Sequence, residues 1–354
     1  LNYVILREKI MKKILYSILI FLLILLNFST VCADDVDNEV DFEDTIEVTA
    51  SNVSELPKTN SRRYIVYDRI SKSMIIGKNE DVKSAMASTT KIMTTIVILE
   101  KANLNEKVTV SAKAGGTGGS RLGLKRGDKA SVRDLLYGLM LRSGNDAAVA
   151  LAEHVGGSVK GFAELMNEKA IELGLTNTHF VTPHGLDDAN HYTTALELAK
   201  LTDYAMNNET FAKIVGTKST TIYINNQSRQ INNTNELLGV LNGVVGVKTG
   251  FTNNAGRCLV TETKRNNMDI ITIVLGADTK KDRTKDSVNL IEYTFSKYKM
   301  YNLEEQIIKE FNKWKNINEK RILIIKGKTS NPKLALGAIE KATIPICDND
   351  KIEY

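Results

Sequence analysis

The chain has 354 residues, of which 42% are hydrophobic and 25% are charged, and its formal net charge is +5. This composition is ordinary for a globular protein, and the length suits one large domain or two smaller ones. Without residues 1–33 the charge falls to +2, because four basic residues and one acidic residue are lost. So small a charge argues against nucleic-acid binding.

Residues 1–33 have the organisation of a secretory signal peptide. Two lysines at 12–13 precede the apolar run Ile14–Phe28, which is followed by the short segment S-T-V-C-A. A membrane-spanning helix needs about 20 apolar residues, and this run is weakened by Asn27. We therefore predict export across the membrane, with an uncleaved N-terminal anchor as the alternative.

An acidic segment separates this leader from the folded part of the chain. Residues 34–47 carry eight Asp or Glu in fourteen positions, which is typical of a solvated leader or linker. We assign residues 34–60 to it. Beyond it, R-Y-I-V-Y-D and S-M-I-I-G flank the turn-like segment Arg69–Lys72 and predict a β-hairpin.

Helical patterns fill the middle of the chain. Ser88 is expected to cap the run T-T-K-I-M-T-T-I-V-I-L-E-K, and S-V-R-D at 131–134 has capping-box spacing ahead of L-L-Y-G-L-M-L. A third helix is expected from Ser158 to Leu173, with Gly174 ending it. Thr193 opens a fourth helix.

After residue 215 the pattern becomes strand-like. G-V-V-G-V-K-T-G, G-R-C-L-V-T-E-T and M-D-I-I-T-I-V-L-G predict successive strands, the last two joined by the turn K-R-N-N. A helix is expected at about Asp286–Tyr298, and residues 300–354 are expected to form a small β-rich domain, shortened at its end. Because strands lie at both ends with helices between them, we predict an α/β protein of the α+β type. Its antiparallel sheet joins the two ends of one domain, residues 61–299.

Three short motifs occur along this domain. They are S-x-x-K at Ser88/Lys91, S-x-N at Ser143/Asn145, and K-T-G at 248–250. The first two recur elsewhere by chance, so neither alone separates a catalytic serine from a helix cap. Together they lie about 55 and then 105 residues apart, at a helix start, an inter-helix loop and a strand end. That combination is specific.

With these motifs the chain resembles the penicillin-recognising serine peptidases, which include penicillin-binding proteins and serine β-lactamases. Four longer stretches carry the resemblance, at 119–128, 134–152, 182–195 and 246–260. It is closest to the low-molecular-mass penicillin-binding proteins that act as D-alanyl-D-alanine carboxypeptidases, the peptidase S11 type, and covers roughly residues 60–300. The resemblance implies the serine β-lactamase/D,D-peptidase fold, an antiparallel sheet flanked by helices with a helical subdomain.

The chemistry explains why these residue types are needed. A serine hydroxyl is a poor nucleophile until a base takes its proton, and Lys91 lies on the same helix face as Ser88. The lysine must be neutral to act, which a second ammonium from Lys248 favours. Ser143 is expected to relay a proton to the leaving amine. Asn145 is expected to bind the substrate amide and to hold Lys91.

The resemblance also implies a binding site for a substrate that ends in a carboxylate. The backbone N–H groups of Ser88 and Phe251 are expected to stabilise the oxyanion. Thr249 and Gly250 are expected to contact the substrate, Thr249 through its hydroxyl. Arg283, which follows the last predicted strand, matches the carboxylate-binding arginine of the family.

The predicted function is a serine D-Ala-D-Ala carboxypeptidase that trims peptidoglycan stem peptides through an acyl-enzyme on Ser88 and is inhibited by β-lactams. One alternative is a serine β-lactamase, against which we note that no E-x-x-L-N motif lies between Asn145 and Lys248. The other is a catalytically silent wall-binding protein, against which the intact motifs argue. Whether water or an amine takes the acyl group is left open.

No cofactor, metal or nucleic-acid partner is predicted. His184 and His191 lie beside Asp187 and Asp188, but this spacing matches no known zinc motif, so a structural role is expected. The end of the chain carries no basic amphipathic segment of the kind that lies on membranes. Peripheral membrane association is therefore left open, without a C-terminal anchor helix.

Overall fold

The structure is a computed structural model, which describes residues 55–302, 309, 312–314 and 341–345. The predicted signal peptide, most of the acidic leader and most of the predicted C-terminal domain lie outside these residues. From the C-terminal region it describes two antiparallel strands, β10 (Tyr298–Asn302) and β11 (Lys341–Pro345). Among the described helices, none combines the length and the apolarity that a bilayer span requires.

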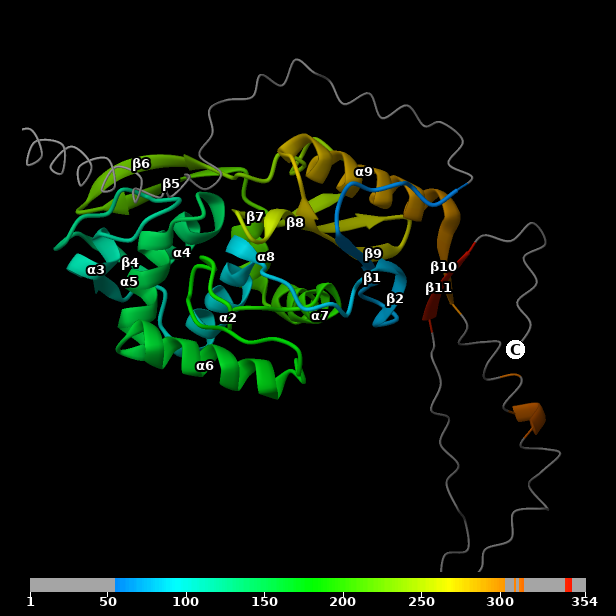
Figure 1. Ribbon diagram of the computed structural model, residues 1–354, viewed down its shortest axis with the longest axis horizontal. Coiled ribbons are helices and arrows are strands. Elements are labelled where there is room, and N and C mark those ends of the chain that lie inside the picture. Colours follow the sequence, from blue (N-terminus) through cyan, green and yellow to red (C-terminus); the bar gives the residue numbers. More distant parts are fainter. Residues whose placement is uncertain (1–54, 303–308, 310–311, 315–340, 346–354) are drawn as a thin grey trace, which may run out of the picture. The chain divides into compact units, whose positions relative to one another are not determined.

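A five-stranded sheet forms the centre of the domain, in the order β2-β1-β9-β8-β7 (Figure 1). Its strands are β1 (Arg63–Asp68), β2 (Ser73–Lys78), β7 (Val244–Thr252), β8 (Gly256–Arg265) and β9 (Met268–Ala277). Every neighbouring pair is antiparallel, and β1 pairs with β9. The prediction that the sheet joins the two ends of the domain is confirmed, as is the β1–β2 hairpin.

Both faces of this sheet are covered by other elements, because its strands carry apolar residues on each face. Ile65 and Ile273 belong to the core shared with the helical region, whereas Val66 and Val274 pack with Leu290 of α9 (Lys280–Lys297). Side chains of a strand alternate between faces, which separates these two sets. Figure 1 shows α9 on one face of the sheet and the helices around α2 (Lys91–Lys101) on the other.

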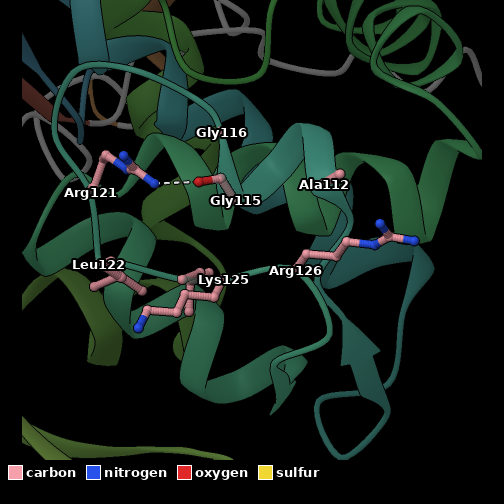
Figure 2. A pocket seen from close by; sticks show the side chains of 9 residues that line it. Ala112, Gly115, Gly116, Arg121, Leu122, Lys125 and Arg126 are labelled. Carbon is pink, nitrogen blue, oxygen red and sulfur yellow. Dashed lines mark hydrogen bonds between the residues drawn. The ribbon is translucent and has the colours of Figure 1, made fainter.

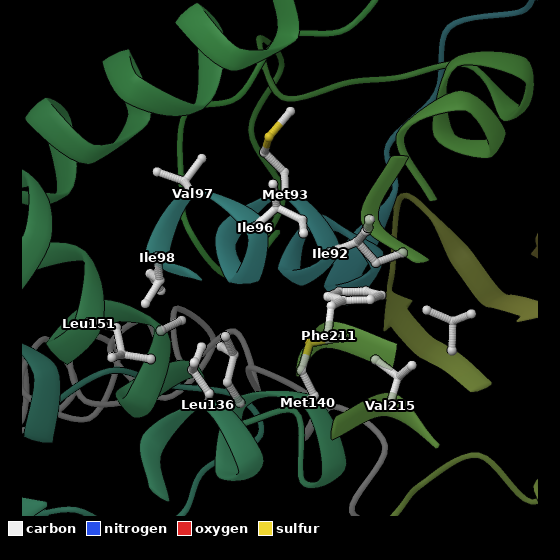
Figure 3. Packing of buried hydrophobic residues seen from close by; sticks show 14 of the residues in the cluster. Ile92, Met93, Ile96, Val97, Ile98, Leu136, Met140, Leu151, Phe211 and Val215 are labelled. Atoms are coloured by element: carbon white, nitrogen blue, oxygen red, sulfur yellow. The ribbon is translucent and has the colours of Figure 1, made fainter. Parts of the chain in front are cut away.

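The helical region surrounds one buried helix, α2 (Lys91–Lys101), of which residues 91–98 are all buried. A helix that is buried all round is held on every side and offers little freedom to move. The other helices are α3 (Ala112–Gly115), α4 (Val132–Leu141), α5 (Asn145–Gly156), α6 (Val159–Glu172), α7 (Ala195–Met206) and α8 (Glu209–Val215). Figure 3 shows Ile92 of α2 next to Phe211 of α8, and Ile98 of α2 next to Leu151 of α5.

A second sheet, which the sequence analysis did not predict, borders the helical region. Its order is β3-β4-β5-β6, formed by β3 (Lys107–Thr109), β4 (Lys129–Ser131), β5 (Ser219–Ile224) and β6 (Gln227–Asn232). All its pairings are antiparallel. The β6 strand matters for function because it leads directly into the segment that borders the K-T-G motif.

Several helix boundaries differ from the predictions. Ser131 caps α4 and Ser158 caps α6, as predicted. The fourth helix begins after Thr194 rather than Thr193, because Thr194 accepts the N–H of residue 197. The prediction that Ser88 caps a helix is wrong, since neither η1 (Ala87–Thr90) nor α2 has a side-chain cap.

The last helix was predicted to begin too late. The α9 helix begins at Lys280, six residues before the predicted start at Asp286, and Thr279 caps it by accepting the N–H of Asp282 at 3.0 Å. Arg283 therefore lies in the first turn of a helix and not in a loop. Its position is therefore determined by the packing of α9 on the sheet.

Candidate active site

Ser88 lies in a tight turn that its neighbours hold. The 3-10 helix η1 directly precedes α2, and Ala87 has a positive φ of 48°. The hydroxyls of Thr89 and Thr90 donate to the carbonyls of Met86 and Ala87, at 2.6 and 2.8 Å. Such local side-chain bonds stabilise turns against helix. They fix Ser88 at the start of the buried helix α2.

Lys91 joins Ser88 to two other segments. Its Nζ lies 2.7 Å from Ser88 Oγ, 2.7 Å from Asn145 Oδ1 and 3.0 Å from the backbone oxygen of His184. The lysine is fully buried and Ser88 is only 2% exposed. The predicted contacts of Lys91 with Ser88 and Asn145 are present. A separation of 2.7 Å is also short enough for a proton to pass between Ser88 Oγ and Lys91 Nζ.

Asn145, the first residue of α5, is fixed from the other side by residues 118–120. Its Nδ2 donates to the oxygen of Gly118 at 2.9 Å, and its backbone N–H donates to the oxygen of Ser120 at 2.7 Å. Gly119 has φ +78°, and a Cβ there would come within 2.5 Å of Asn145 Nδ2. Glycine is therefore required at 119, and the amide that holds Lys91 cannot rotate freely.

Ser143 occupies the turn between α4 and α5. Its φ is +58°, which is uncommon for a residue with a side chain. Its Oγ is buried and makes no hydrogen bond to the part of the chain that the structure describes. Buried hydroxyls are nearly always bonded, and strained backbone of this kind clusters at active sites. The Ser143 hydroxyl is therefore able to donate or accept a further hydrogen bond.

The K-T-G motif lies on β7 and passes directly beside Ser88. A Cβ on Gly250 would lie 3.0 Å from the backbone nitrogen of Ser88, so any side chain at position 250 would crowd the Ser88 backbone. Lys248 Nζ donates to the oxygen of Thr249 at 2.8 Å, and the hydroxyls of Thr249 and Thr234 lie 2.8 Å apart. The ring of Phe251, beyond them, faces a guanidinium of β8.

The comparisons with known proteins agree with this geometry. The Peptidase S11 family model, described as D-alanyl-D-alanine carboxypeptidase, matches residues 49–279. The chain belongs to the peptidase S11 family. It is 37% identical over 245 residues to D-alanyl-D-alanine carboxypeptidase DacF of Bacillus subtilis, a match that covers 68% of this chain and 63% of DacF. It is 38% identical over 270 residues to DacC of Escherichia coli, covering 70% of this chain and 64% of that protein.

Two solved structures of similar proteins have the same fold. The Streptomyces K15 DD-transpeptidase superposes with a TM-score of 0.64 at 35% identity, covering 68% of this chain and 99% of that one. DacD of Francisella tularensis has a TM-score of 0.66 at 30% identity, with 71% and 74% covered. The predicted fold is confirmed. The chain matches about two thirds of the length of DacF and DacC.

His191, for which a structural role was predicted, connects a loop to the turn of Ser88. Its Nδ1 accepts the N–H of Val181 at 2.9 Å, so Nε2 carries the proton and donates to Thr90 Oγ1 at 2.8 Å. Burial lowers the pKa of His191 to about 4, against the opposing effect of the Asp188 carboxylate. The ring therefore stays neutral near pH 7 and keeps both bonds.

The same loop carries the carbonyl that binds Lys91, a contact that the sequence analysis missed. Gly185 has φ +88°, and a Cβ there would lie 1.9 Å from the oxygen of Ala87. Burial and, to a lesser extent, the nearby Lys91 ammonium lower the pKa of His184 to about 3. Within the described residues, no group of three or more His, Cys, Asp or Glu is arranged to hold a metal ion.

The side chain of Arg283 is buried and already has a charged partner. It is 1% exposed and forms an ion pair with Glu236, whose Oε1 also accepts the hydroxyl of Thr284. Its Nε is buried without a partner among the described residues. Glu236 follows Thr234 by two positions, so the pair borders the segment that contacts Thr249. The carboxylate-binding role of Arg283 stays a prediction.

The Arg283–Glu236 ion pair should make part of the stability of the fold sensitive to acid. Burial alone would raise the pKa of Glu236, but the guanidinium and the Thr284 hydroxyl hold this pKa below its ordinary value. The stabilisation is thus present above about pH 4.5 and is lost as the pH falls through the lower folded pKa. Replacing Glu236→Gln leaves a buried charge without its partner, and should lower the free energy of unfolding at pH 7 by about 3 kcal/mol.

Urea unfolding from pH 3 to 7 measures this difference. The double variant Glu236→Gln/Arg283→Met is the matched control, because it removes both charges and should recover part of the lost stability. If the single variant is as stable as wild type at pH 7, the pair does not contribute as described.

Proposed function

We propose that this S11 protein is a serine D-Ala-D-Ala carboxypeptidase that removes the terminal D-alanine from peptidoglycan stem peptides. The single observation that carries the proposal is the 2.7 Å contact between Lys91 Nζ and Ser88 Oγ in a buried site. Asn145 and the K-T-G strand border that contact. The names of DacF and DacC support the same activity.

In the proposed acylation, Ser88 Oγ attacks the carbonyl carbon between the two D-alanines while Lys91 Nζ takes the hydroxyl proton. The N–H groups of Ser88 and Phe251 stabilise the oxyanion. The C–N bond then breaks, and the proton passes from Lys91 through the Ser143 hydroxyl to the leaving amine. Water next attacks the ester, which releases the shortened peptide and restores the Ser88 hydroxyl.

The substrate carboxylate is assigned to the Thr249 hydroxyl and the Arg283 guanidinium. Support comes from the position of Thr249 two residues before Phe251, and from the Nε of Arg283, which has no hydrogen-bond partner among the described residues. Because Glu236 already neutralises this arginine, the substrate carboxylate has to share its charge. A guanidinium has five N–H donors, so it serves both carboxylates without breaking the existing pair.

The proposal also places the protein outside the cytoplasm, where its substrate lies. The leader at residues 1–33 supports export. β-Lactams should act as covalent inhibitors, because their strained amide occupies the position of the scissile bond and leaves an ester on Ser88. Peripheral membrane association is compatible with this assignment, and no cofactor takes part in it.

Two parallel assays test the proposal on the exported chain. The first measures D-alanine released from a synthetic peptide ending in D-Ala-D-Ala, with and without an added amine acceptor. The second measures intact-protein mass and remaining drug after exposure to benzylpenicillin. We expect D-alanine release with a persistent one-to-one adduct.

The other outcomes identify the alternatives. Destruction of the penicillin without an adduct would indicate a β-lactamase. Neither adduct nor D-alanine release would indicate a silent wall-binding protein. Transfer of the acyl group to the amine would indicate transpeptidation, the activity for which the similar Streptomyces K15 enzyme is named.

A further inference from the structure

Three arginines line a surface hollow of about 350 Å³ that contains neither Ser88 nor Lys91. Arg121 lies in the segment before β4, Arg142 at the end of α4 and Arg229 on β6. Separate parts of the chain thus bring three guanidinium groups to one place. The remaining lining comes from their neighbours, such as Leu122, Ile222 and Asn232.

This hollow is connected to the active site through three of its own residues. Arg142 directly precedes Ser143, and Arg121 directly follows Ser120, whose oxygen accepts the backbone N–H of Asn145. Consecutive Cα atoms are 3.8 Å apart. The backbones of both arginines therefore lie directly beside the segments that hold the catalytic groups.

The third connection leads to the K-T-G strand. Asn232 lines the hollow and is two residues from Thr234, whose hydroxyl lies 2.8 Å from that of Thr249. The backbone N–H of Thr234 also donates to the oxygen of Leu141, next to Arg142, at 3.0 Å. The hollow therefore adjoins both sides of the site, the S-x-N turn and the K-T-G strand.

A second hollow, of about 700 Å³, shares Arg121 with the first and adds Lys125 and Arg126 (Figure 2). Figure 2 shows Arg121 and Lys125 on one side and Arg126 extending along the other. Positive charge thus continues outward from the arginine hollow. Neither hollow has an Asp or Glu among its lining residues.

The three arginines keep most of their donors available. Arg121 donates to the oxygen of Gly115, and Arg229 NH1 donates to the oxygen of Leu122 at 3.0 Å. Both acceptors are neutral backbone groups, which orient a guanidinium without neutralising it. None of these three arginines forms an ion pair with another described residue.

We propose that Arg121, Arg142 and Arg229 form a subsite for a carboxylate carried by the substrate peptide upstream of the scissile bond. The inference rests on the proposed function and deepens it, because it names an acidic peptide as the preferred substrate class. A guanidinium binds a carboxylate through two parallel hydrogen bonds. Three of them in one hollow of this size favour a single compact anionic group.

The location favours a peptide carboxylate over an extended anionic polymer. A polymer would need only the exposed outer charges, whereas the arginine hollow adjoins the Ser143 and Thr249 segments, which border the proposed catalytic groups. Arg142 and Arg229 are half-buried, which strengthens their attraction for a carboxylate relative to fully solvated side chains.

Kinetics with two matched peptides test this subsite. Both end in D-Ala-D-Ala and differ only in one upstream glutamate or glutamine, placed in turn at each of three positions. For at least one position, wild type should prefer the glutamate peptide in kcat/KM. The variant Arg121→Gln/Arg142→Gln/Arg229→Gln should lose about tenfold of that preference, and added salt should weaken it in wild type.

Two further variants keep the test decisive. The triple variant Lys101→Gln/Lys160→Gln/Lys200→Gln removes the same charge from exposed positions outside both hollows, and should retain the preference. Arg142→Glu is a single change at a side chain with no hydrogen bond to lose among the described residues, and should reverse the preference towards the glutamine peptide. If the triple arginine variant fails to fold, this single variant tests the subsite in its place.

The outcomes separate this inference from the proposed function. D-alanine release with no glutamate preference at any position, or a preference that survives the arginine changes, overturns the subsite alone. Arginine-dependent inhibition by inorganic polyphosphate without a glutamate preference would assign the hollow to an anionic polymer instead. Absence of both D-alanine release and a penicillin adduct in wild type would overturn the proposed function first.

Discussion

Replacement of Ser88 by alanine should abolish the penicillin adduct and lower D-alanine release by at least about 10⁴-fold. The reason is that the acyl group has no other acceptor, whereas Lys91 keeps its contacts with Asn145 and the His184 oxygen. The fold should survive, because the change removes one hydroxyl and one hydrogen bond, worth about 1 kcal/mol. Intact-protein mass and thermal unfolding measure the two effects.

Thr202→Val is a suitable control for Ser88→Ala. It also removes a buried hydroxyl, one that donates to the oxygen of Leu198 at 2.7 Å within α7. This variant should form the adduct at the wild-type rate. An adduct on Ser88→Ala, or loss of the adduct in both variants, would contradict the assignment of Ser88 as the nucleophile.

The central sheet could be predicted from the sequence, but the second sheet was missed despite an equivalent signal. Asn266 and Asn267, in K-R-N-N, both have positive φ and join β8 to β9. Asn225 and Asn226 do the same between β5 and β6. The difference is in the flanking strands, since β5 buries only Ile222 and Ile224. A strand with so few apolar residues resembles a loop in its composition.

The start of α9 was missed for a related reason. Its first buried apolar residue is Val288, and the turns before it are mostly charged, so the apolar periodicity begins late. The cap itself is legible, because Thr279 and Asp282 have capping-box spacing. Placing Arg283 inside a helix required weighing that cap above the periodicity.

The side-chain members of the site were predictable because their chemistry requires particular residue types. The contact of Lys91 with the His184 oxygen was not, since every residue has a backbone carbonyl and no pattern marks one of them. The pairing of Glu236 with Arg283 was also missed, because it joins residues 47 positions apart in segments whose packing the sequence alone does not define.

Replacing Lys91 by methionine should slow acylation by benzylpenicillin about 10³-fold, the effect expected of a general base. Methionine fills much of the buried space but has no group that accepts the Ser88 proton. The rate of adduct formation from pH 6 to 10, followed by intact mass, measures this effect.

A second variant separates the loss of a base from the loss of a positive charge. Arginine keeps the charge and does not release a proton in this pH range, so Lys91→Arg should be about as slow as Lys91→Met if Lys91 acts as the base. If Lys91→Arg retains a rate within tenfold of wild type, the ammonium acts by electrostatics and another group takes the proton. Ser143 is then the next side chain to replace, because its buried hydroxyl makes no hydrogen bond among the described residues.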